Sequence, residues 1–253
     1  MDDFHNDPFL SIICVNWGCD SDIRLSLDSV VRQNYQDTNF EVVVVVSGVP
    51  FDKITELKSS YKQINVKWIV DQDEGLYNAM NLGVRRADGT HVFFLNSGDE
   101  LIHKNSLTTL LKNAVVNRIT LFSCVQVYQN DHYERPSKKD LLKGKKVSHQ
   151  GFLAPITYVV FLFDEKIGPC ADSQWMADYL NHTLYSSVDF AIVKFSLGGV
   201  SNSMSLNSLR KRVKNTAVRK KAKEYIKFFI SLLISTRMRY RLFALVNGYN
   251  KVG

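Results

Sequence analysis

The residues best suited to chemistry lie between positions 71 and 101, where carboxylates, amides and glycines surround short apolar runs. An acidic cluster, Asp71–Glu74, precedes a glycine, and Asn96–Glu100 follows the apolar run His91–Leu95. A carboxylate such as Asp99, on a turn after a buried strand, can hold Mg²⁺ or Mn²⁺ against a diphosphate. These cations share oxygen ligands between one or two carboxylates and substrate phosphates. The same residue types also form ordinary tight turns, so the turn alone leaves both interpretations open.

The elements around this stretch place its polar residues at one edge of a sheet. Leu76–Ala87 mixes apolar and polar residues at a spacing that predicts a helix with one buried face. Gly89 is typical of the stop after such a helix, and His91–Leu95 is long enough for a buried strand. In open α/β sheets, ligands bind beyond the carboxyl ends of the strands. The Asn96–Glu100 turn occupies that position.

The preceding residues predict the rest of a parallel sheet. Phe9–Trp17, Phe40–Val46 and Val66–Val70 are apolar runs of strand length, and five consecutive valines in the second indicate a strand buried on both faces. Asp20–Asn34 has the apolar spacing of a helix. Alternation of strands and helices predicts parallel strands joined by crossovers.

Two blocks at fixed spacing resemble a known family. The chain carries D-x-G-L-Y-N-A-M-N-x-G from Asp73 to Gly83, then F-L-N-S-G-D from Phe94 to Asp99. This resembles the family-two glycosyltransferases of GT-A fold, closest to a bacterial branch that builds exopolysaccharide, colanic-acid-type and O-antigen chains. Agreement at so many fixed positions is more specific than a lone glycine motif. Resemblance extends over roughly residues 9–205.

The resemblance implies a set of site residues. Asp99 would hold the divalent cation, Mn²⁺ or Mg²⁺. Substrate and nucleotide would be bound by Asp73, Tyr77, Asn81, Ser97, Gly98, His149 and Gln150. His149 belongs to a block that resembles the family's S-H-Q-G, although a single histidine at a strand end can equally be structural. Asp172 matches the acid that opens a helix and supplies the catalytic base; from spacing alone it is also a plausible helix N-cap.

One loop departs from the family pattern. After the valine strand the family has an acid-rich Asp-Gly-Gly-Ser turn, whereas this chain reads Ser47–Asp52, in which only Asp52 could replace the first acid. Further along, Asn105–Asn117 predicts a helix, Ile119–Val127 a strand, and the charged stretch Asp131–Gly144 a surface loop. Gly198-Gly199 could cradle an anion or form a plain turn.

Composition indicates a folded protein in a reducing compartment. The 253 residues are 45% hydrophobic, and the four cysteines are scattered without metal-ligand spacing. The first eight residues do not have the character of a secretory signal, and no apolar run approaches the length of a membrane span. We therefore expect a cytoplasmic location.

The net charge of +7 conceals a strong asymmetry. Residues 207–253 hold 13 Lys and Arg and one acid, a balance of +12, whereas residues 1–206 hold 19 basic and 24 acidic residues, a balance of −5. We expect a GT-A domain at 1–205 and a basic, amphipathic helical tail at 206–253. Cations beside apolar residues favour an anionic membrane surface; packing on the catalytic domain is the alternative. Nothing resembles a nucleic-acid-binding module.

Together these features predict an α/β protein with a mainly parallel GT-A sheet. The predicted activity is inverting transfer from a nucleotide-sugar, UDP-linked, to a lipid-carried saccharide of bacterial surface polysaccharide (O-antigen, lipopolysaccharide, exopolysaccharide or capsule). The protein would lie peripherally on the inner face of the membrane. The alternative is a non-catalytic GT-A protein that binds within a polysaccharide assembly complex.

Overall fold

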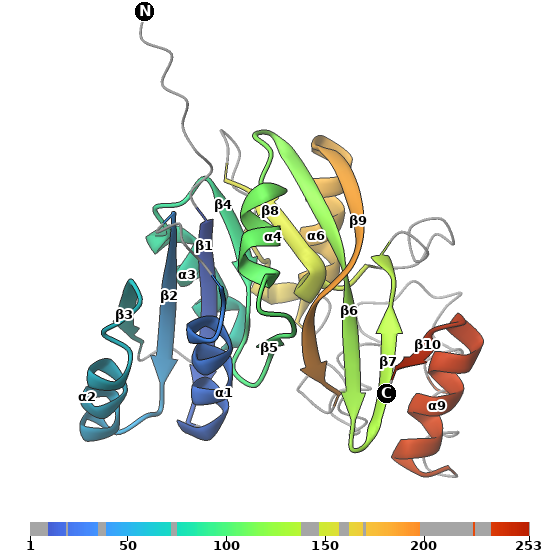
Figure 1. The fold of residues 1–253 in the computed structure, drawn as a ribbon, viewed down its shortest axis with the longest axis horizontal. Coiled ribbons are helices and arrows are strands. Elements are labelled where there is room, and N and C mark those ends of the chain that lie inside the picture. Colours follow the sequence, from blue (N-terminus) through green and yellow to red (C-terminus); the bar gives the residue numbers. More distant parts are fainter. Residues whose placement is uncertain are drawn as a thin grey trace, which may run out of the picture.

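A single mixed sheet organises the chain, and the computed structural model describes residues 10–18, 20–34, 39–71, 75–137, 147–156, 162–168, 171–197, 225 and 234–252. Its strands follow the order β10-β7-β6-β8-β4-β1-β2-β3, with β9 paired to β5 and β6 (Figure 1). The predicted α/β fold with a mainly parallel central sheet is confirmed.

The parallel part of the sheet arises from the first half of the chain. It comprises β1 (Leu10–Trp17), β2 (Phe40–Ser47), β3 (Val66–Val70) and β4 (His91–Phe94). The connecting helices are α1 (Asp20–Val31), α2 (Phe51–Ser60) and α3 (Leu76–Arg86). Every residue of β2 is buried, because helices cover both faces of this strand.

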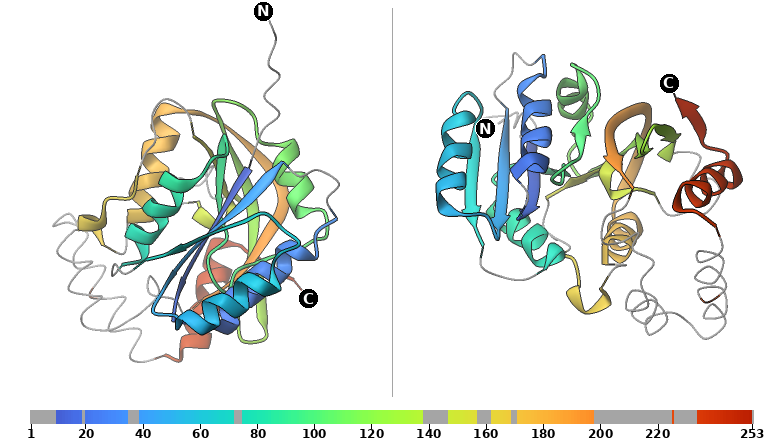
Figure 2. Two further views of the ribbon diagram at one scale, coloured as in Figure 1. Left: turned by 90° about the vertical axis from the view of Figure 1, so that its left-hand side faces the viewer. Right: turned by 90° about the horizontal axis from the view of Figure 1, so that it is seen from below.

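Two hydrophobic clusters, one on each face, hold the helices against the sheet. Alternate residues of β1 divide between them, Ile12 packing with α1, α2 and α4 (Ser106–Lys112) and Ile13 with α3 and α6 (Ala171–His182). Figure 2 shows these two sets of helices on opposite sides of the sheet. The carboxyl ends of β1, β2 and β4 therefore share one edge, between the two helical layers.

The second half of the chain extends the sheet with mostly antiparallel pairs. Its strands are β5 (Glu100–Leu101), β6 (Arg118–Tyr128), β7 (Asp131–Arg135), β8 (Phe152–Pro155) and β9 (Leu184–Ser196). Short 3₁₀ turns, η1 (His149–Gly151) and η2 (Glu165–Ile167), precede β8 and α6. β6 is long and central, pairing with β7 and β8 antiparallel and with β9 parallel.

The surface loop predicted for Asp131–Gly144 is wrong in its first part. Residues Asp131–Arg135 form β7, and Asp131 is buried because arginines from the end of the chain neutralise it. The sequence suggested a loop since charged residues usually lie in solvent. Burying an unpaired carboxylate is costly, but pairing with arginines from the end of the chain offsets that cost for Asp131.

The end of the chain joins the sheet. α9 (Thr236–Asn247) begins at Ser235, whose side chain accepts from Met238 N, and ends at Gly248 in the left-handed conformation. β10 (Asn250–Val252) then pairs antiparallel with β7 and becomes the edge strand. Within the described residues, no helix is both long and apolar enough to cross a membrane. Of the basic helical tail expected at 206–253, only Tyr225 and residues 234–252 belong to the described part of the chain.

Candidate active site

The turn after β4 is fixed to the end of β1, at the edge where ligands of α/β sheets bind. The Ser97 N–H donates to Val15 O over 3.1 Å, and Ser97 Oγ donates to Asn16 Oδ1 over 2.7 Å. Ser97, which the resemblance predicted to bind substrate, therefore lies at this edge with its hydroxyl hydrogen directed at Asn16. The oxygen keeps a lone pair with which it can accept a further hydrogen bond.

Gly98 adopts a backbone conformation that side chains rarely tolerate, with φ of +90°. Its N–H donates to both Asp22 O and Ser26 Oγ, each over 3.0 Å. The amide therefore faces α1, and Gly98 serves to lock the turn against that helix.

Asp99 is a buried carboxylate, 8% exposed, at the end of this turn. Its N–H donates to Asn96 O over 2.9 Å, which closes the turn. Burial raises the pKa of the Asp99 carboxyl well above its ordinary value. Burial also raises the pKa of the Cys14 thiol, and the nearby Asp99 charge raises it further. Asp99 therefore lies close to Cys14, on the α1 face of the sheet.

The orphaned Oδ2 of Asp99 bears on whether a divalent cation fits here. This oxygen is buried without a hydrogen-bond partner in the described structure. Such an oxygen suits a hard cation that takes one carboxylate and completes its shell with phosphates and water. No group of three His, Cys, Asp or Glu side chains gathers as a metal site among the described residues. The described residues therefore fit a cation that takes one protein ligand, Asp99, and its other ligands from substrate phosphates and water.

Asp172 and His149 meet across the site from α6 and η1. Asp172 lies in the first turn of α6, where Oδ1 accepts from Ser173 N over 2.7 Å. Its Oδ2 lies 3.4 Å from His149 Nδ1. The opposite ring nitrogen, Nε2, is buried and has no partner in the described part of the chain. Asp172 is the second residue of α6 and not its N-cap, the position that spacing alone had suggested, and it forms one member of an acid–imidazole pair.

The position of η1 depends on close backbone packing. A Cβ at Gly151 would collide with the carbonyl oxygen of Phe122 in β6, so only glycine allows this approach. In the same turn Gln150 Oε1 accepts from Ser148 Oγ over 2.5 Å. Gln150 retains its amide N–H groups as donors, within the same 3₁₀ turn as His149.

Asn81 and Phe163 form a clamp between α3 and the segment that leads into η2. Asn81 Nδ2 donates to Phe163 O over 2.9 Å, and Phe163 N donates to Asn81 Oδ1 over 2.8 Å. The Asn81 side chain is buried. This geometry favours a positioning function for Asn81 over the direct substrate contact that the resemblance implied.

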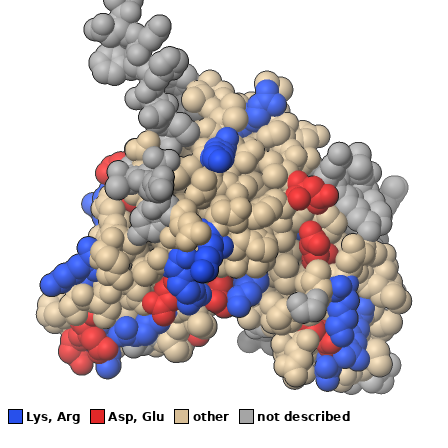
Figure 3. Space-filling view, in the orientation of Figure 1, with Lys and Arg blue, Asp and Glu red and all other residues tan. Residues whose placement is uncertain are grey.

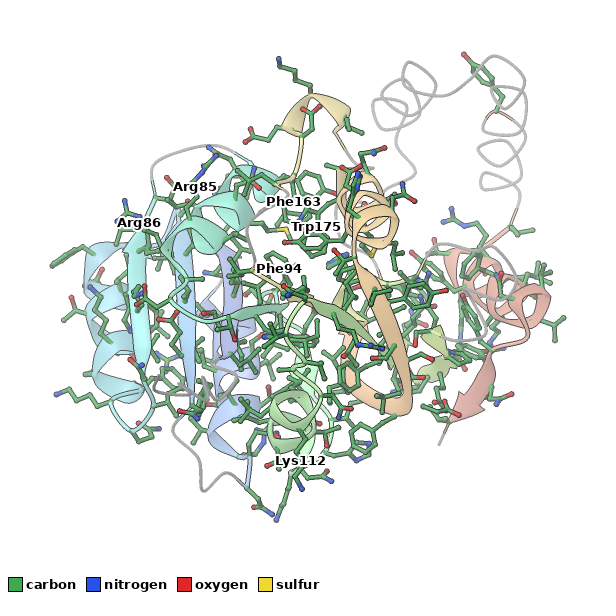
Figure 4. The ribbon with its side chains drawn as sticks, turned by 90° about the horizontal axis from the view of Figure 1, so that it is seen from above. Arg85, Arg86, Phe94, Lys112, Phe163 and Trp175 are labelled. Atoms are coloured by element: carbon green, nitrogen blue, oxygen red, sulfur yellow. The ribbon has the colours of Figure 1, made fainter. Side chains whose placement is uncertain are left out.

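An aromatic cluster continues the clamp to the base of α6. Phe163 stacks on Trp175 with centroids 4.9 Å apart and on Tyr77 at 5.4 Å, while Phe94 meets the rings of Phe163 and Trp175 edge-on (Figure 4). Trp175 is one turn after Asp172, so the cluster fixes the start of α6 against β4. Sequence reasoning missed this cluster, for which the aromatic residues around Asp172 were the available signal.

Two exposed aromatic residues also escaped the sequence reasoning. Trp17, at the end of β1, is 78% exposed, and Phe51, at the start of α2, is 80% exposed. Between them Gly48 has φ of +66°, and a Cβ there would lie 3.2 Å from Trp17 Nε1. They flank the loop that lacks the family's acid, in which Ser47 Oγ donates to Asp71 O over 3.1 Å. Asp52 lies in the first turn of α2.

Four buried polar atoms without partners belong to the segments at this edge. They are Asn16 Nδ2, Asn96 Oδ1, Asp99 Oδ2 and His149 Nε2, as judged over the described residues. Buried polar groups are nearly always paired, so a concentration of exceptions indicates a ligand. Asp73, the remaining predicted contact, and the Gly198-Gly199 turn lie outside the described residues.

Comparison with protein families agrees with this geometry. The model for "Glycosyl transferase family 2" matches residues 11–163, more than half of the chain. The chain is 28% identical over 119 residues to the uncharacterized glycosyltransferase EpsJ of Bacillus subtilis, covering 46% of this chain and 33% of the relative. It is 32% identical over 102 residues to a PGL/p-HBAD biosynthesis glycosyltransferase of Mycobacterium bovis, covering 40% and 39% respectively. The chain thus spans only a minor part of these relatives.

Solved structures share the fold at low identity. TarS of S. aureus, solved with UDP-GlcNAc, superposes with a TM-score of 0.62 and 17% identity, over 85% of this chain and 69% of that one. The mannosyltransferase PcManGT of Pyrobaculum calidifontis, solved with GDP-Man and Mn²⁺, gives 0.61 and 15%, over 89% and 70%.

Proposed function

The chain belongs to glycosyl transferase family 2, and we propose that it moves a hexosyl or N-acetylhexosaminyl group, with inversion, from a UDP-linked donor to a lipid-carried saccharide. The observation that carries this proposal is the group of four unpaired buried polar atoms at the carboxyl edge of β1 and β4. Buried polar atoms without partners favour a polar ligand, and a nucleotide-sugar offers the hydroxyl and phosphate groups that could pair with them.

The donor's nucleobase would stack on the aromatic residues beside the altered loop. Trp17, at the end of β1, and Phe51, at the start of α2, are largely exposed, and a base can stack on an aromatic ring without a specific hydrogen bond. This arrangement compensates for the missing acid of Ser47–Asp52. Because TarS is a fold neighbour solved with UDP and with UDP-GlcNAc, uridine is the first nucleotide to test.

The transfer needs a group that accepts one proton. The acceptor hydroxyl oxygen forms a bond to the anomeric carbon, the bond from that carbon to the diphosphate breaks, and the electron pair leaves with UDP. The hydroxyl proton passes to Asp172, with the His149 imidazole beside it at 3.4 Å to orient the carboxylate. A cation held by Asp99 would stabilise negative charge on the diphosphate.

The substrate contacts are proposals. We propose direct contacts for Tyr77, Ser97, Gln150 and His149, and for Asp73 from the resemblance alone, while Asn81 and Gly98 position the elements that carry them. The expected setting is synthesis of a bacterial surface polysaccharide, at the inner face of the cell membrane, with the basic tail on anionic lipid. The match to EpsJ supports the first part of this setting only as a resemblance.

UDP release provides the decisive assay. The protein is incubated with UDP-sugars and a lipid-linked saccharide extract, with Mn²⁺, with Mg²⁺ or with chelator, and released UDP is measured. We expect release that depends on both donor and acceptor. If donors bind in calorimetry but no extract supports release, the second candidate holds.

That second candidate is a GT-A-fold binding protein within a polysaccharide assembly complex. It is favoured by Ser47-Gly48-Val49, where the family has acids, and by the lack of a three-residue metal cluster in the described structure. Such a protein would bind the nucleotide-sugar with unchanged affinity when Asp172 is replaced, and it would turn nothing over.

A further inference from the structure

The orientation of α9 on the sheet is fixed by one buried carboxylate. Asp131, 2% exposed at the start of β7, accepts from Arg237 Nε over 2.8 Å and from Arg241 Nε over 2.9 Å. Arg241 Nη2 donates to the second oxygen over 3.0 Å, and Lys251 Nζ from β10 lies 3.4 Å away. Because Arg237 and Arg241 are one helical turn apart, they fix the roll of α9 about its axis.

A second contact agrees with this roll. Tyr240 meets Tyr128 of β6 with ring centroids 4.7 Å apart, and Ala244 and Asn247 are buried. The helix therefore directs one side at β6 and β7. The opposite side must face outward.

That outward side is apolar. Met238, Leu242, Leu245 and Val246, which we call the α9 stripe, recur at the spacing of one helix face. All four are exposed, Leu245 by 75% and Val246 by 79%. Single exposed apolar residues are ordinary, but four in one stripe on a 12-residue helix mark an interaction surface.

Cations lie close to the α9 stripe, although Arg237, Arg241 and Lys251 are directed at Asp131 and not at the stripe itself. Residues 234–252 contain Arg237, Arg239, Arg241 and Lys251 and no acid, so with Asp131 the cluster has four positive charges and one negative, a net +3. Figure 3 shows Lys and Arg gathered over the region in which Figure 1 places α9 and β10. A second copy docked on this stripe would bring two such clusters together, which like-charge repulsion opposes.

α9 also lies toward the end of the molecule that carries the candidate active site. In Figure 1, α9 lies beside the lower part of β6 and β7, at the end toward which β2 points. The carboxyl ends of the parallel strands, with the candidate active site, are at that same end.

We propose that the α9 stripe is the surface by which this protein lies on an anionic lipid bilayer, with its apolar side chains in the interface and the net positive charge of the Asp131 cluster attracting the anionic headgroups. This inference rests on the proposed function in one respect: a lipid-carried acceptor requires the active site to be held near the membrane. The Asp131 contacts would set the angle at which the catalytic domain sits.

The test uses the full chain and its co-sedimentation with phosphatidylcholine vesicles, with and without phosphatidylglycerol. Leu245→Asp with Val246→Asp should weaken binding to the anionic vesicles by at least about tenfold, because two apolar side chains no longer enter the interface. The matched control, Val116→Asp with Leu184→Asp, changes two side chains that are 61% and 70% exposed elsewhere. It should bind as the wild type does.

Several results would overturn the proposal. Equal binding of the double variant and the wild type would remove the α9 stripe from the interface, and equal binding to neutral and anionic vesicles would remove the charge argument. A wild-type dimer in light scattering that the double variant abolishes would make the stripe a self-association surface. UDP release with donor and a soluble saccharide acceptor should be the same in the wild type and the double variant. Its absence in the wild type would refute the proposed function and leave vesicle binding as a separate result.

Discussion

At the scale of single residues, the buried carboxylate of Asp99 offers an oxygen to a cation and destabilises the folded state when it is charged. Its pKa is raised by burial, so the folded protein binds this proton more tightly than the unfolded chain does. The associated stability is present below the ordinary carboxyl pKa of about 3.9 and is lost as pH rises through the raised value.

Asp99→Asn should therefore melt at a higher temperature than the wild type at pH 8, and the difference should shrink as pH falls toward 4. The same variant should bind nucleotide-sugar more weakly and turn over more slowly, because the amide is a poorer cation ligand. Calorimetric melting over a pH series, beside donor titration with and without Mn²⁺, checks both parts. If Asp99→Asn kept wild-type activity and that activity still required the metal, another residue would hold the cation.

The Asp172–His149 pair makes a different prediction. Asp172→Asn should leave donor affinity near wild type and lower kcat by roughly 10²–10⁴-fold, the usual contribution of a positioned base. His149→Gln should lower kcat less, since it removes only the neighbour of the base. Because the two side chains act as a unit, the double variant should be little worse than Asp172→Asn alone.

Steady-state kinetics on all three proteins, with donor affinity by calorimetry, distinguishes this pair from independent roles. A donor affinity that collapses in Asp172→Asn would reassign the residue to binding or to helix capping. If the two losses in kcat multiplied in the double variant, His149 and Asp172 would act independently.

Sequence motifs selected residues that lie near the candidate site, but they did not predict the direction in which each polar group points. Fixed spacing singled out Asn81 and Gly98, yet the structure turns the Asn81 amide to Phe163 and the Gly98 N–H to α1. Trp17 and Phe51 had no pattern of their own, since an exposed aromatic residue is recognised only once its surroundings are known.

At the scale of elements, the clamp between Asn81 and Phe163 joins α3 to the segment before α6. Asn81→Ala would leave the N–H and C=O of Phe163 buried without partners, at about 1–3 kcal/mol for each group. We expect a lower melting temperature and, because Phe163 stacks on Trp175, a lower kcat from a displaced Asp172.

Arg85→Ala is the matched control, because it changes the exposed side of the same helix and should leave both quantities unchanged. Denaturant unfolding and UDP release measure the two effects. If Asn81→Ala kept full stability but lost donor affinity, Asn81 would contact the substrate after all.

The sequence predicted strands that consist of uninterrupted apolar runs. It missed strands whose charged residues pair with residues far away in the chain. β1 to β4 stand out because apolar runs of strand length are buried on both faces. β7 and β10 do not, since charged residues such as Asp131 and Lys251 are typical of loops. Only the folded chain brings Arg237 and Arg241, more than a hundred positions away, to Asp131, which also pairs with Lys251.

At the scale of the whole molecule, the structure shows where part of the basic tail attaches to the acidic domain. The sequence predicted a basic tail beside a mildly acidic domain, and the structure attaches the last part of that tail to β7 through Asp131. Hydrogen bonds from Arg241 and Arg237 hold the pKa of Asp131 well below its usual range, so the contact is fully charged at neutral pH and weakens only as pH falls below about 4.

Asp131→Asn tests whether this attachment sets the orientation of the domain on a bilayer. The variant keeps the α9 stripe and gains net positive charge, so binding to anionic vesicles should persist or strengthen. Transfer to a vesicle-embedded saccharide acceptor should nevertheless fall severalfold, because α9 is no longer held against β7 and the active site loses its fixed angle. UDP release with a detergent-free soluble acceptor analogue should stay near wild type. Glu134→Gln, on the same strand, is the control and should change neither. Parallel losses with both acceptors would instead mean that Asp131 supports the fold of the catalytic domain.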